Sequence, residues 1–457
     1  MKFLENIKKY KNNTALITEQ RKIITYNKLN IFVKKFSKNF KKRSLAFIIS
    51  NNDLETIVAY LSFIGKNCVV MLIDQKTNEE TISDLVENYC PEYIFLNQKK
   101  TIRINDYFLA DKFFNYTLLK SKNKKKYKMI DELALLMPTS GSTGSQKYVM
   151  LSYENLNFNT KCIINSLKIK KKDITITTLP MSYVYGLSII NTHLVQGSSI
   201  VLNTKSVMEK DFWKSIENNN VNNFGGVPYI YQILSKMNLF KFNLKSLKYT
   251  TQAGGKLNLD ILKNILKNYK KMNVKLFCMY GASEATARMS ILDWKFINKK
   301  IGSVGKALKG TKFNIEKKTN EIIFSGKNVF LGYAENISDL NKSYNNNILK
   351  TGDIGHLDKD NFLYITGRKD RYVKIYGMRI SLEELEDRIF KLGEENVCSA
   401  PKENMINVYI KSKRNFKELI KKISSYTKIH ASCFNIIKVS EFPLNKNLKI
   451  SYKSLTR

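Results

Sequence analysis

Short apolar runs rich in β-branched residues alternate with amphipathic stretches along most of this chain. The runs have the length of single strands, as in "SLAFIIS" (44–50), "CVVMLID" (68–74) and "KLFCMYG" (275–281). The stretches between them repeat apolar residues at helical spacing, as in "LETIVAYLSFIG" (54–65) and "LDILKNILKNYKK" (259–271). This alternation predicts parallel or mixed sheets with helices on both faces. In such α/β folds, ligand-binding loops lie at the carboxyl ends of the strands.

The pattern changes at about Lys299. Short strands and turns follow, as in "NFLYITGRKD" (361–370), and they predict a small β-rich subdomain. A further α/β-like segment begins at "SLEELEDRIF" (381–390). With 457 residues, the chain is longer than one ordinary domain. We therefore expect a large α/β body followed by a smaller part.

The formal net charge is +38, from 77 Lys and Arg against 39 Asp and Glu. A charge of this size is typical of proteins that bind nucleic acid or a membrane surface. However, the lysines are spread along the whole chain, and no RNA-binding aromatic signature accompanies them. We therefore favour lysine-rich solvated faces and expect no nucleic-acid partner. The positive field would also attract polyanions such as ATP, coenzyme A or an acidic carrier protein.

The six cysteines contain no C-x-x-C pair, and the three histidines are far apart, which argues against a zinc site. Reduced thiols are typical of cytoplasmic proteins. The first residues lack the apolar core of a signal peptide, and no apolar run has the length of a membrane span. We expect a cytoplasmic protein without a membrane span.

A loop rich in glycine and hydroxyl groups, "TSGSTGSQK" (139–147), follows the predicted strand "ALLM". Glycines allow the backbone to approach a ligand closely, and successive N–H groups form a cradle for phosphate. Lys147 adds a charge that can pair with outer phosphates. The common G-x-x-x-x-G-K-[ST] loop does not fit this spacing. The loop therefore suits phosphate, with a flexible Ser/Gly turn as the structural alternative.

Two carboxylates follow strand-like runs. Glu284 comes after "MYG" (279–281), and one carboxylate beside a phosphate loop suits Mg²⁺, which also takes phosphate oxygens and water. A glutamate at a helix start is the alternative. Asp353 in "TGDIG" (351–355) suits either the two hydroxyls of a ribose or an Asp-containing turn.

These motifs occur in the order found in the adenylate-forming ligases, the superfamily of acyl-CoA synthetases, non-ribosomal-peptide adenylation domains and luciferases, which the chain resembles over nearly its whole length. Near the start, "IITYNKL" (23–29) is similar to that superfamily's T-Y-x-E-L segment. Around the nucleotide, "TSGSTGSQK" is similar to its phosphate loop, "QAGGKL" (252–257) to its adenine-contacting turn, "YGASE" (280–284) to its Y-G-x-T-E motif, and "TGD" (351–353) to its ribose-binding aspartate. Toward the C-terminus, "GRKDRYVKIYGMRI" (367–380) is similar to its hinge motif, and "FPLNKNLK" (442–449) to its C-terminal lysine motif. The resemblance implies an α/β fold with a large N-terminal AMP-binding domain of mixed sheets flanked by helices plus a β-rich subdomain (1–369). A small mobile α+β C-terminal domain (371–457) would follow, with the hinge at Asp370.

The resemblance also implies a reaction in two steps. A carboxylate attacks the α-phosphate of Mg-ATP to give an acyl-adenylate and pyrophosphate, and a phosphopantetheine thiol, of coenzyme A or an acyl carrier protein, then displaces AMP. The residues that would hold the pyrophosphate are Thr139, Ser140, Gly141, Ser142, Thr143, Gly144 and Lys147. The nucleotide would contact Gly254, Gly255, Tyr280, Gly281 and the neighbourhood of Thr286, with its ribose on Asp353 and Arg368, and Glu284 would bind Mg²⁺.

Lys449 resembles the lysine that reaches the substrate carboxylate and the α-phosphate, where a cation stabilises the charge that builds up in the transition state. Another face of the C-terminal domain, with Gly377 and Arg379, would line the tunnel for the thiol arm. Rotation about Asp370 would exchange the two faces, a rearrangement of the kind that often limits turnover.

The acyl pocket would be lined by Tyr183 and Val184 in "TLPMSYVYGLS" and by Gly225, Gly226 and Pro228 in "FGGVPYIY". Members that activate α-amino acids have an aspartate near Val184, and a buried amine without a counter-ion is unfavourable. The aromatic residues suggest a small-to-medium acyl group.

The chain departs from the family pattern at three residues. Gln146 and Tyr148 replace proline and glycine beside Lys147, and Leu448 replaces a glycine before Lys449. We therefore expect an ATP-dependent acid–thiol ligase. The alternatives are a ligase that loads an amino acid onto a stand-alone carrier protein and, more remotely, a basic nucleic-acid-binding protein on a ligase scaffold.

Overall fold

The computed structural model describes residues 9–100, 102, 104–123, 128–138, 147–344, 347–376, 378–411, 416–445 and 447–455. The chain forms two compact units. The first comprises Met1–Lys312 and Ser325–Leu349, and the second comprises Phe313–Phe324 and Lys350–Arg457. Within the described ranges, no helix has the length and hydropathy needed to span a bilayer.

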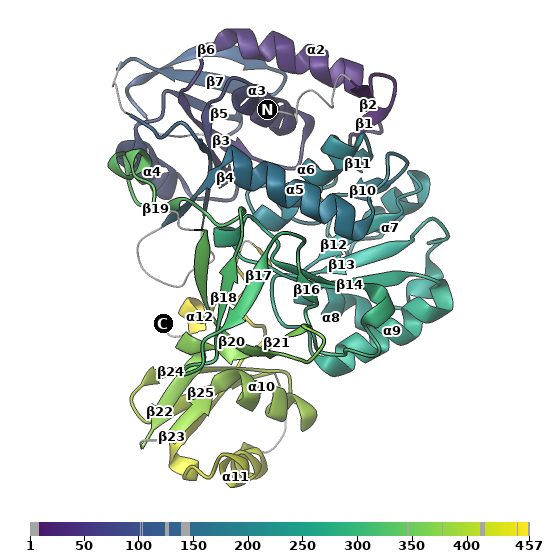
Figure 1. The fold of residues 1–457 in the computed structure, drawn as a ribbon, viewed down its shortest axis with the longest axis vertical. Helices are drawn as coiled ribbons and strands as arrows, with labels where there is room; N and C mark the ends of the chain where they lie inside the picture. Colours follow the sequence, from purple (N-terminus) through teal and green to yellow (C-terminus); the bar gives the residue numbers. More distant parts are fainter. Residues whose placement is uncertain are drawn as a thin grey trace. The chain divides into compact units, whose positions relative to one another are not determined.

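The first unit contains two large sheets (Figure 1). Among the described residues, one sheet has nine strands, in the order β16 (Lys306–Ala307), β15 (Ser290–Leu292), β14 (Lys275–Tyr280), β13 (Tyr249–Gln252), β12 (Asn223–Gly226), β10 (Ile174–Ile176), β11 (Ser199–Val201), β1 (Thr14–Ile17) and β2 (Ile23–Thr25). Strands β14 through β1 in this order are parallel, and the edge strands are antiparallel. Parallel strands need helical crossovers, which agrees with the alternation seen in the sequence.

The second sheet of this unit has eight strands in the described part of the chain, in the order β19 (Gly332–Ala334), β9 (Tyr148–Ser152), β8 (Leu133–Pro138), β4 (Val69–Asp74), β3 (Leu45–Ser50), β5 (Tyr93–Asn97), β7 (Tyr116–Ser121) and β6 (Tyr107–Phe113). Its central strands β8, β4, β3 and β5 are parallel. They are buried along nearly their full length, because a sheet covered on both faces favours continuous apolar runs over alternation.

The helices of the first unit are α2 (Tyr26–Phe36), α3 (Leu54–Gly65), α4 (Glu79–Tyr89), α5 (Tyr153–Leu167), α6 (Val184–Gln196), α7 (Lys210–Asn218), α8 (Pro228–Lys236) and α9 (Leu259–Met272). The 3₁₀ turns are η1 (Ser37–Asn39), η2 (Leu239–Lys241), η3 (Ser283–Ala285), η4 (Trp294–Phe296) and η5 (Ile337–Asn341). Helix α5 contacts β8 and β9, α6 contacts β11, and the two helices contact each other, so they pack between the two sheets (Figure 1).

Local sequence explains where these central helices begin and end. Ser152 and Asn155 form a capping box that satisfies backbone N–H groups at the start of α5. Helix α6 is buried almost throughout and ends at Gly197, which has a left-handed φ of 77°. A Cβ on Gly186 would lie 2.2 Å from the carbonyl oxygen of Pro180, so only glycine allows this helix to pack against the preceding segment.

In its described residues, the second unit has three smaller sheets. One sheet consists of β17 (Lys312–Ile315), β18 (Glu321–Ser325), β20 (Ile348–Leu357) and β21 (Leu363–Arg368), and terminal residues of β17, β18 and β20 are assigned to the first unit. Another consists of β22 (Tyr372–Ile375) and β23 (Met378–Ser381), and the third of β24 (Asn396–Lys402), β25 (Met405–Ile410) and β26 (Phe434–Lys438). The helical segments are η6 (Lys369–Arg371), α10 (Leu382–Lys391), α11 (Phe416–Thr427), η7 (Ala431–Cys433) and α12 (Tyr452–Leu455). Apolar side chains of α10, α11 and the β24–β26 sheet share one core.

The predicted fold class is confirmed, since large mixed sheets with helices are followed by a β-rich part and a small α+β part. The compact units divide the chain elsewhere than at Asp370, because strands β17 and β18 group with the residues after 350. Asp370 itself lies in η6, directly after β21. Its role as a hinge stays a prediction.

Candidate active site

The predicted phosphate loop connects two antiparallel strands. Pro138, at the end of β8, pairs with Tyr148, at the start of β9. Thr139, Ser140, Gly141, Ser142, Thr143, Gly144 and Gln146 lie outside the described residues. The described ends of the loop are therefore the last residue of a buried parallel strand and Lys147.

Lys147 forms an ion pair with Glu335, with 3.0 Å between Nζ and Oε1. Strand β19 pairs with β9 so that Ala334 lies opposite Tyr148, which brings the next residue, Glu335, beside Lys147. Both side chains are nearly half exposed. The lysine is thus positioned by an acidic residue that an anionic ligand would have to displace.

Glu284 lies in the short turn η3 that follows β14, and its Oε1 accepts a 3.0 Å hydrogen bond from the hydroxyl of Tyr333. Burial, followed by the nearby Glu284 carboxylate, raises the pKa of Tyr333, so this hydroxyl remains a donor. Tyr333 belongs to β19 and directly follows Gly332. Strand β19 and the residue that follows it therefore contact both predicted phosphate-site groups, Glu284 through Tyr333 and Lys147 through Glu335.

The turn after β14 is fixed by close packing. A Cβ on Gly281 would lie 1.7 Å from the carbonyl oxygen of Ala287, so no other residue fits while the chain returns toward β15. Thr286 has a left-handed φ of 55°, and its hydroxyl donates to the carbonyl oxygen of Asn328 at 2.7 Å. The Asn328 amide donates in turn to the carbonyl oxygens of Ala285 and Arg288. Tyr280, the last residue of β14, is buried.

The predicted adenine turn lies at the end of β13. Gly254 has a φ of 91°, in the region that favours glycine. The side chain of Gln252 donates to the carbonyl oxygen of Gly255 at 2.8 Å and closes the turn. Pro228, at the first position of α8, packs against Gly255, because a Cβ on that glycine would lie 3.2 Å from the proline ring.

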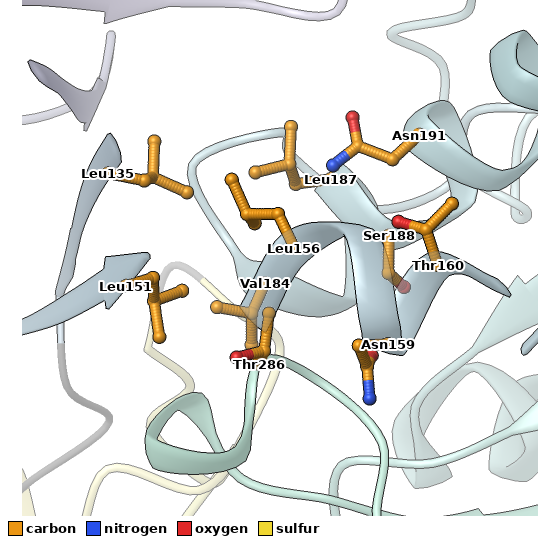
Figure 2. A pocket seen from close by; sticks show the side chains of 10 residues that line it. All are labelled: Leu135, Leu151, Leu156, Asn159, Thr160, Val184, Leu187, Ser188, Asn191 and Thr286. Atoms are coloured by element: carbon orange, nitrogen blue, oxygen red, sulfur yellow. The ribbon is translucent and has the colours of Figure 1, made fainter. Parts of the chain in front are cut away.

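The predicted acyl-pocket residues cluster where α6 begins beside β12. Tyr183 precedes the helix, and Val184 lines a small cavity together with Thr286 and with Ser188 of α6 (Figure 2). A Cβ on Gly225 would lie 2.9 Å from the hydroxyl of Tyr185. A Cβ on Gly226 would lie 3.0 Å from the ring of Tyr231. In this structure, aromatic side chains occupy much of the space that the two glycines leave.

In the second unit, the two predicted ribose-binding residues form an ion pair. Asp353 in β20 lies opposite Arg368 in β21, with 3.0 Å between Oδ1 and Nε. The segment "TGDIG" therefore lies within a strand, and the alternative of an Asp-containing turn is wrong. Arg368 also lies 3.8 Å from a carboxylate oxygen of Asp370.

Lys449 lies in a turn closed by Asn445, whose backbone N–H donates to the Lys449 carbonyl oxygen at 2.7 Å and whose side chain accepts from the Lys449 N–H. Leu448 has a φ of 58°, in the left-handed region that favours glycine. The residue that replaces the family's glycine thus keeps a glycine-like conformation. Gly377 lies outside the described residues, and Arg379 is in β23, where only its backbone is described.

The chain matches known proteins along most of its length. The model of the family described as "AMP-binding enzyme" matches residues 3–334. The chain belongs to the AMP-binding enzyme family.

Two curated 2-succinylbenzoate–CoA ligases are similar to this AMP-binding enzyme. The protein of Bacillus licheniformis is 28% identical over 59% of this chain and 56% of its own length, and that of a Geobacillus species is 24% identical over 90% and 86%. The matched part thus spans little more than half of the Bacillus relative. A solved O-succinylbenzoate coenzyme A synthetase (MenE) from Bacillus subtilis, in complex with ATP and magnesium ion, has the same fold, with a TM-score of 0.79, 20% identity, and coverage of 100% and 99% of the two chains.

The match to the AMP-binding family confirms the superfamily that the motifs of the sequence resemble. The individual roles of the predicted site residues stay predictions. Three residues of this AMP-binding enzyme had no predicted role, although they contact those residues or line a cavity with them: Tyr333, Glu335 and Arg288. The signal for Arg288 is its place four residues after Glu284, the last residue of the motif "YGASE" (280–284).

Arg371 was also missed, and it organises the second unit. Its guanidinium contacts Glu386 at 2.5 Å, donates to the carbonyl oxygen of Cys398 at 2.8 Å and lies 4.1 Å from the ring centre of Tyr452. Glu386 also accepts a hydrogen bond from the Cys398 N–H. The segment just after Lys449 is thereby attached to the core of its unit.

Proposed function

We propose that this chain uses ATP to convert a carboxylic acid to an acyl-adenylate and then transfers the acyl group to the thiol of coenzyme A. In the first step, an oxygen of the acid bonds to the α-phosphorus and the α–β bond breaks, releasing pyrophosphate. In the second, the thiolate sulfur bonds to the acyl carbon and AMP leaves.

The observation that carries this proposal is the arrangement around β19. This strand and the residue that follows it contact Glu284 through Tyr333 and Lys147 through Glu335, beside the two ends of the loop that resembles the family's phosphate loop. A cation for the departing pyrophosphate and a carboxylate for Mg²⁺ are thereby attached to one short segment. The family membership of residues 3–334 supports the same chemistry.

Magnesium fits the chemistry of Glu284. Its Oε1 is held by Tyr333, whereas its Oε2 has no hydrogen-bond partner within the described residues, so a carboxylate oxygen is available to a hard cation. When bound, the metal would neutralise charge on the phosphates. The protein's part is to hold this carboxylate in place through the tyrosine hydroxyl.

We further propose that the second unit supplies the remaining groups. Asp353 accepts hydrogen bonds from the ribose hydroxyls, and Arg368 holds the Asp353 carboxylate in place through their ion pair. Lys449 meets the acid and the α-phosphate, and Asp370 is the hinge between a domain of residues 1–369 and one of residues 371–457. Gly377 and Arg379 lie along the path of the thiol arm.

The names of the relatives make 2-succinylbenzoate the first acid to test and coenzyme A the first acceptor. An α-amino acid is disfavoured, because Val184 offers no counter-ion for an ammonium group at the expected position. A carrier protein bears the same thiol arm as coenzyme A and is the acceptor that the experiment must compare.

The test is ATP–pyrophosphate exchange across a panel of aromatic, fatty, dicarboxylic and amino acids. We expect exchange that depends on one or a few acids, followed by thioester formation with coenzyme A. Absence of exchange with every acid would contradict the proposal. Faster transfer to a phosphopantetheinylated carrier protein than to coenzyme A would retain acid activation but replace the acceptor.

A further inference from the structure

A second cavity of the first unit shares Ser188 with the cavity of Figure 2 and lies between α5, α6 and the nine-stranded sheet. Its lining combines apolar groups such as Ile189 with the polar side chains of His193, Tyr249 and Arg288. Gly225, a predicted acyl-pocket residue, lines it too. The cavity therefore shares lining residues with the region where we expect the acyl group.

Arg288 is a buried cation. Its exposed fraction is 2%, and no carboxylate in the described part of the chain forms an ion pair with it. The guanidinium donates to the carbonyl oxygen of Ala287 at 3.1 Å, contacts the sulfur of Met279 at 3.4 Å and lies 3.8 Å from the ring centre of Tyr185. Buried charges in proteins are ordinarily paired, because removing them from water is unfavourable. Burial lowers the pKa of this guanidinium, yet arginine remains charged in proteins.

Two further polar atoms at the same cavity lack hydrogen-bond partners within the described residues. They are the hydroxyl of Tyr249 and Nε2 of His193, and both side chains are more than nine-tenths buried. The hydroxyl can donate to an anion. His193 contacts the carbonyl oxygen of Ile189 through Nδ1 at 2.8 Å, so that nitrogen carries the proton and Nε2 is an acceptor. An anionic ligand that reaches the cavity would satisfy the Tyr249 hydroxyl, whereas Nε2 of His193, an acceptor, cannot pair with a carboxylate.

We propose that Arg288 pairs with a second acidic group of the acid substrate, remote from the carboxylate that is adenylated, and so selects acids with two anionic groups. This inference rests on the proposed function and names the substrate class of the same site. The cavity has room for about one water molecule, so we expect only the second acidic group of the acid to reach it, with movement of the side chains that line it. Tyr185 stacks on the guanidinium and lies one residue beyond Val184, which connects this subsite to the predicted acyl pocket.

The experiment compares 2-succinylbenzoate, which has two carboxylates, with 4-oxo-4-phenylbutanoate and 2-butanoylbenzoate, each of which lacks one of them. Pyrophosphate exchange gives KM and kcat for each acid with the wild-type chain and with Arg288→Met. We expect the variant to raise KM for the diacid by about 30-fold, since a charge-assisted pair is lost, and to change KM for the better monoacid by less than about 3-fold. Arg288→Lys keeps the charge and should recover part of the preference.

Tyr249→Phe removes the second donor without changing the shape of the side chain, and we expect a smaller rise in KM for the diacid alone. Tyr60→Phe is the matched control, because Tyr60 on α3 has a buried hydroxyl without a partner in the described chain but does not line this cavity. Equal losses with diacid and monoacids, or no loss, would overturn the assignment of Arg288 and indicate a structural role. A wild-type chain that activates acids without preferring the diacid overturns this inference alone, whereas one that activates no acid overturns the proposed function as well.

Discussion

Lys147 and Glu335 form an ion pair across two neighbouring strands, with 3.0 Å between Nζ and Oε1. If Lys147 holds pyrophosphate, the ligand must displace Glu335, whose charge also repels it. Glu335→Gln should therefore tighten ATP binding about 2- to 5-fold and change the free energy of unfolding little, because exposed pairs contribute less than about 1 kcal/mol. Titration calorimetry with ATP and Mg²⁺ measures the first effect, and Lys147→Met, which should weaken binding, is the control. Weaker ATP binding by Glu335→Gln would refute this account of the pair.

Tyr148 replaces a glycine of the family loop, and it is a core residue. Its exposed fraction is 1%, and its ring packs edge-on against Tyr89 with centres 5.8 Å apart. Restoring glycine should lower the free energy of unfolding by about 3–5 kcal/mol because the change leaves a cavity. Chemical denaturation measures this, with Tyr148→Phe as a mild control. The glycine of the family pattern is therefore expected to destabilise this chain. A Tyr148→Gly variant as stable as the wild type would contradict this prediction and show that neighbouring side chains fill the space of the Tyr148 ring.

Leu448 has a left-handed backbone conformation, which is unfavourable for a residue with a Cβ by about 1–2 kcal/mol. Leu448→Gly should therefore stabilise the turn before Lys449, by up to about 1 kcal/mol after the greater flexibility of glycine in the unfolded chain is counted. Asn447→Gly, at a neighbouring residue without positive φ, should instead be neutral or destabilising. Unfolding midpoints of the two variants decide between these outcomes, and equal effects would show that strain at Leu448 is absent.

Lys449→Ala should abolish the first half-reaction, because the cation that stabilises charge at the α-phosphate is lost. Transfer of the acyl group from a supplied acyl-adenylate to coenzyme A should persist, since that step does not need this lysine. Exchange and thioester formation are measured separately on the same preparation. Equal loss of both half-reactions would mean that Lys449 has another role, and Lys438→Ala, in β26, is a control for loss of a surface charge in the same unit.

His193 is buried, and burial lowers its pKa below the ordinary value of 6.5. The unfolded chain then binds this proton more readily, so the stabilising contribution of neutral His193 is present above about pH 6.5 and is lost as pH falls through the lower folded-state pKa. The stability difference between the wild type and His193→Gln should therefore shrink between pH 7.5 and 5, by at most about 1.4 kcal/mol per pH unit. His430→Gln, at an exposed histidine, is the control. A difference that does not vary with pH would contradict this prediction.

The order of strands and motifs follows from the sequence alone, because each depends on local pattern. The runs at 44–50, 68–74 and 275–281 correspond to β3, β4 and β14, and the segments at 54–65 and 259–271 correspond to α3 and α9. Such elements depend on apolar periodicity and capping residues, and both of these signals lie within the element itself or next to its ends. The family motifs are equally local, so they too were recognisable.

Long-range pairing decided the rest. Tyr333 and Glu335 reach Glu284 and Lys147 only because β19 pairs with β9, far away in sequence, and no periodicity encodes that partner. Arg288 looked like any basic residue of a lysine-rich chain until packing of α6 against the nine-stranded sheet buried it without a carboxylate in the described surroundings. The sequence determined which chemical groups the chain carries and in what order. Burial and cross-strand neighbours exist only in the folded chain, and they decided which of those groups are paired with other protein groups and which are left for a ligand.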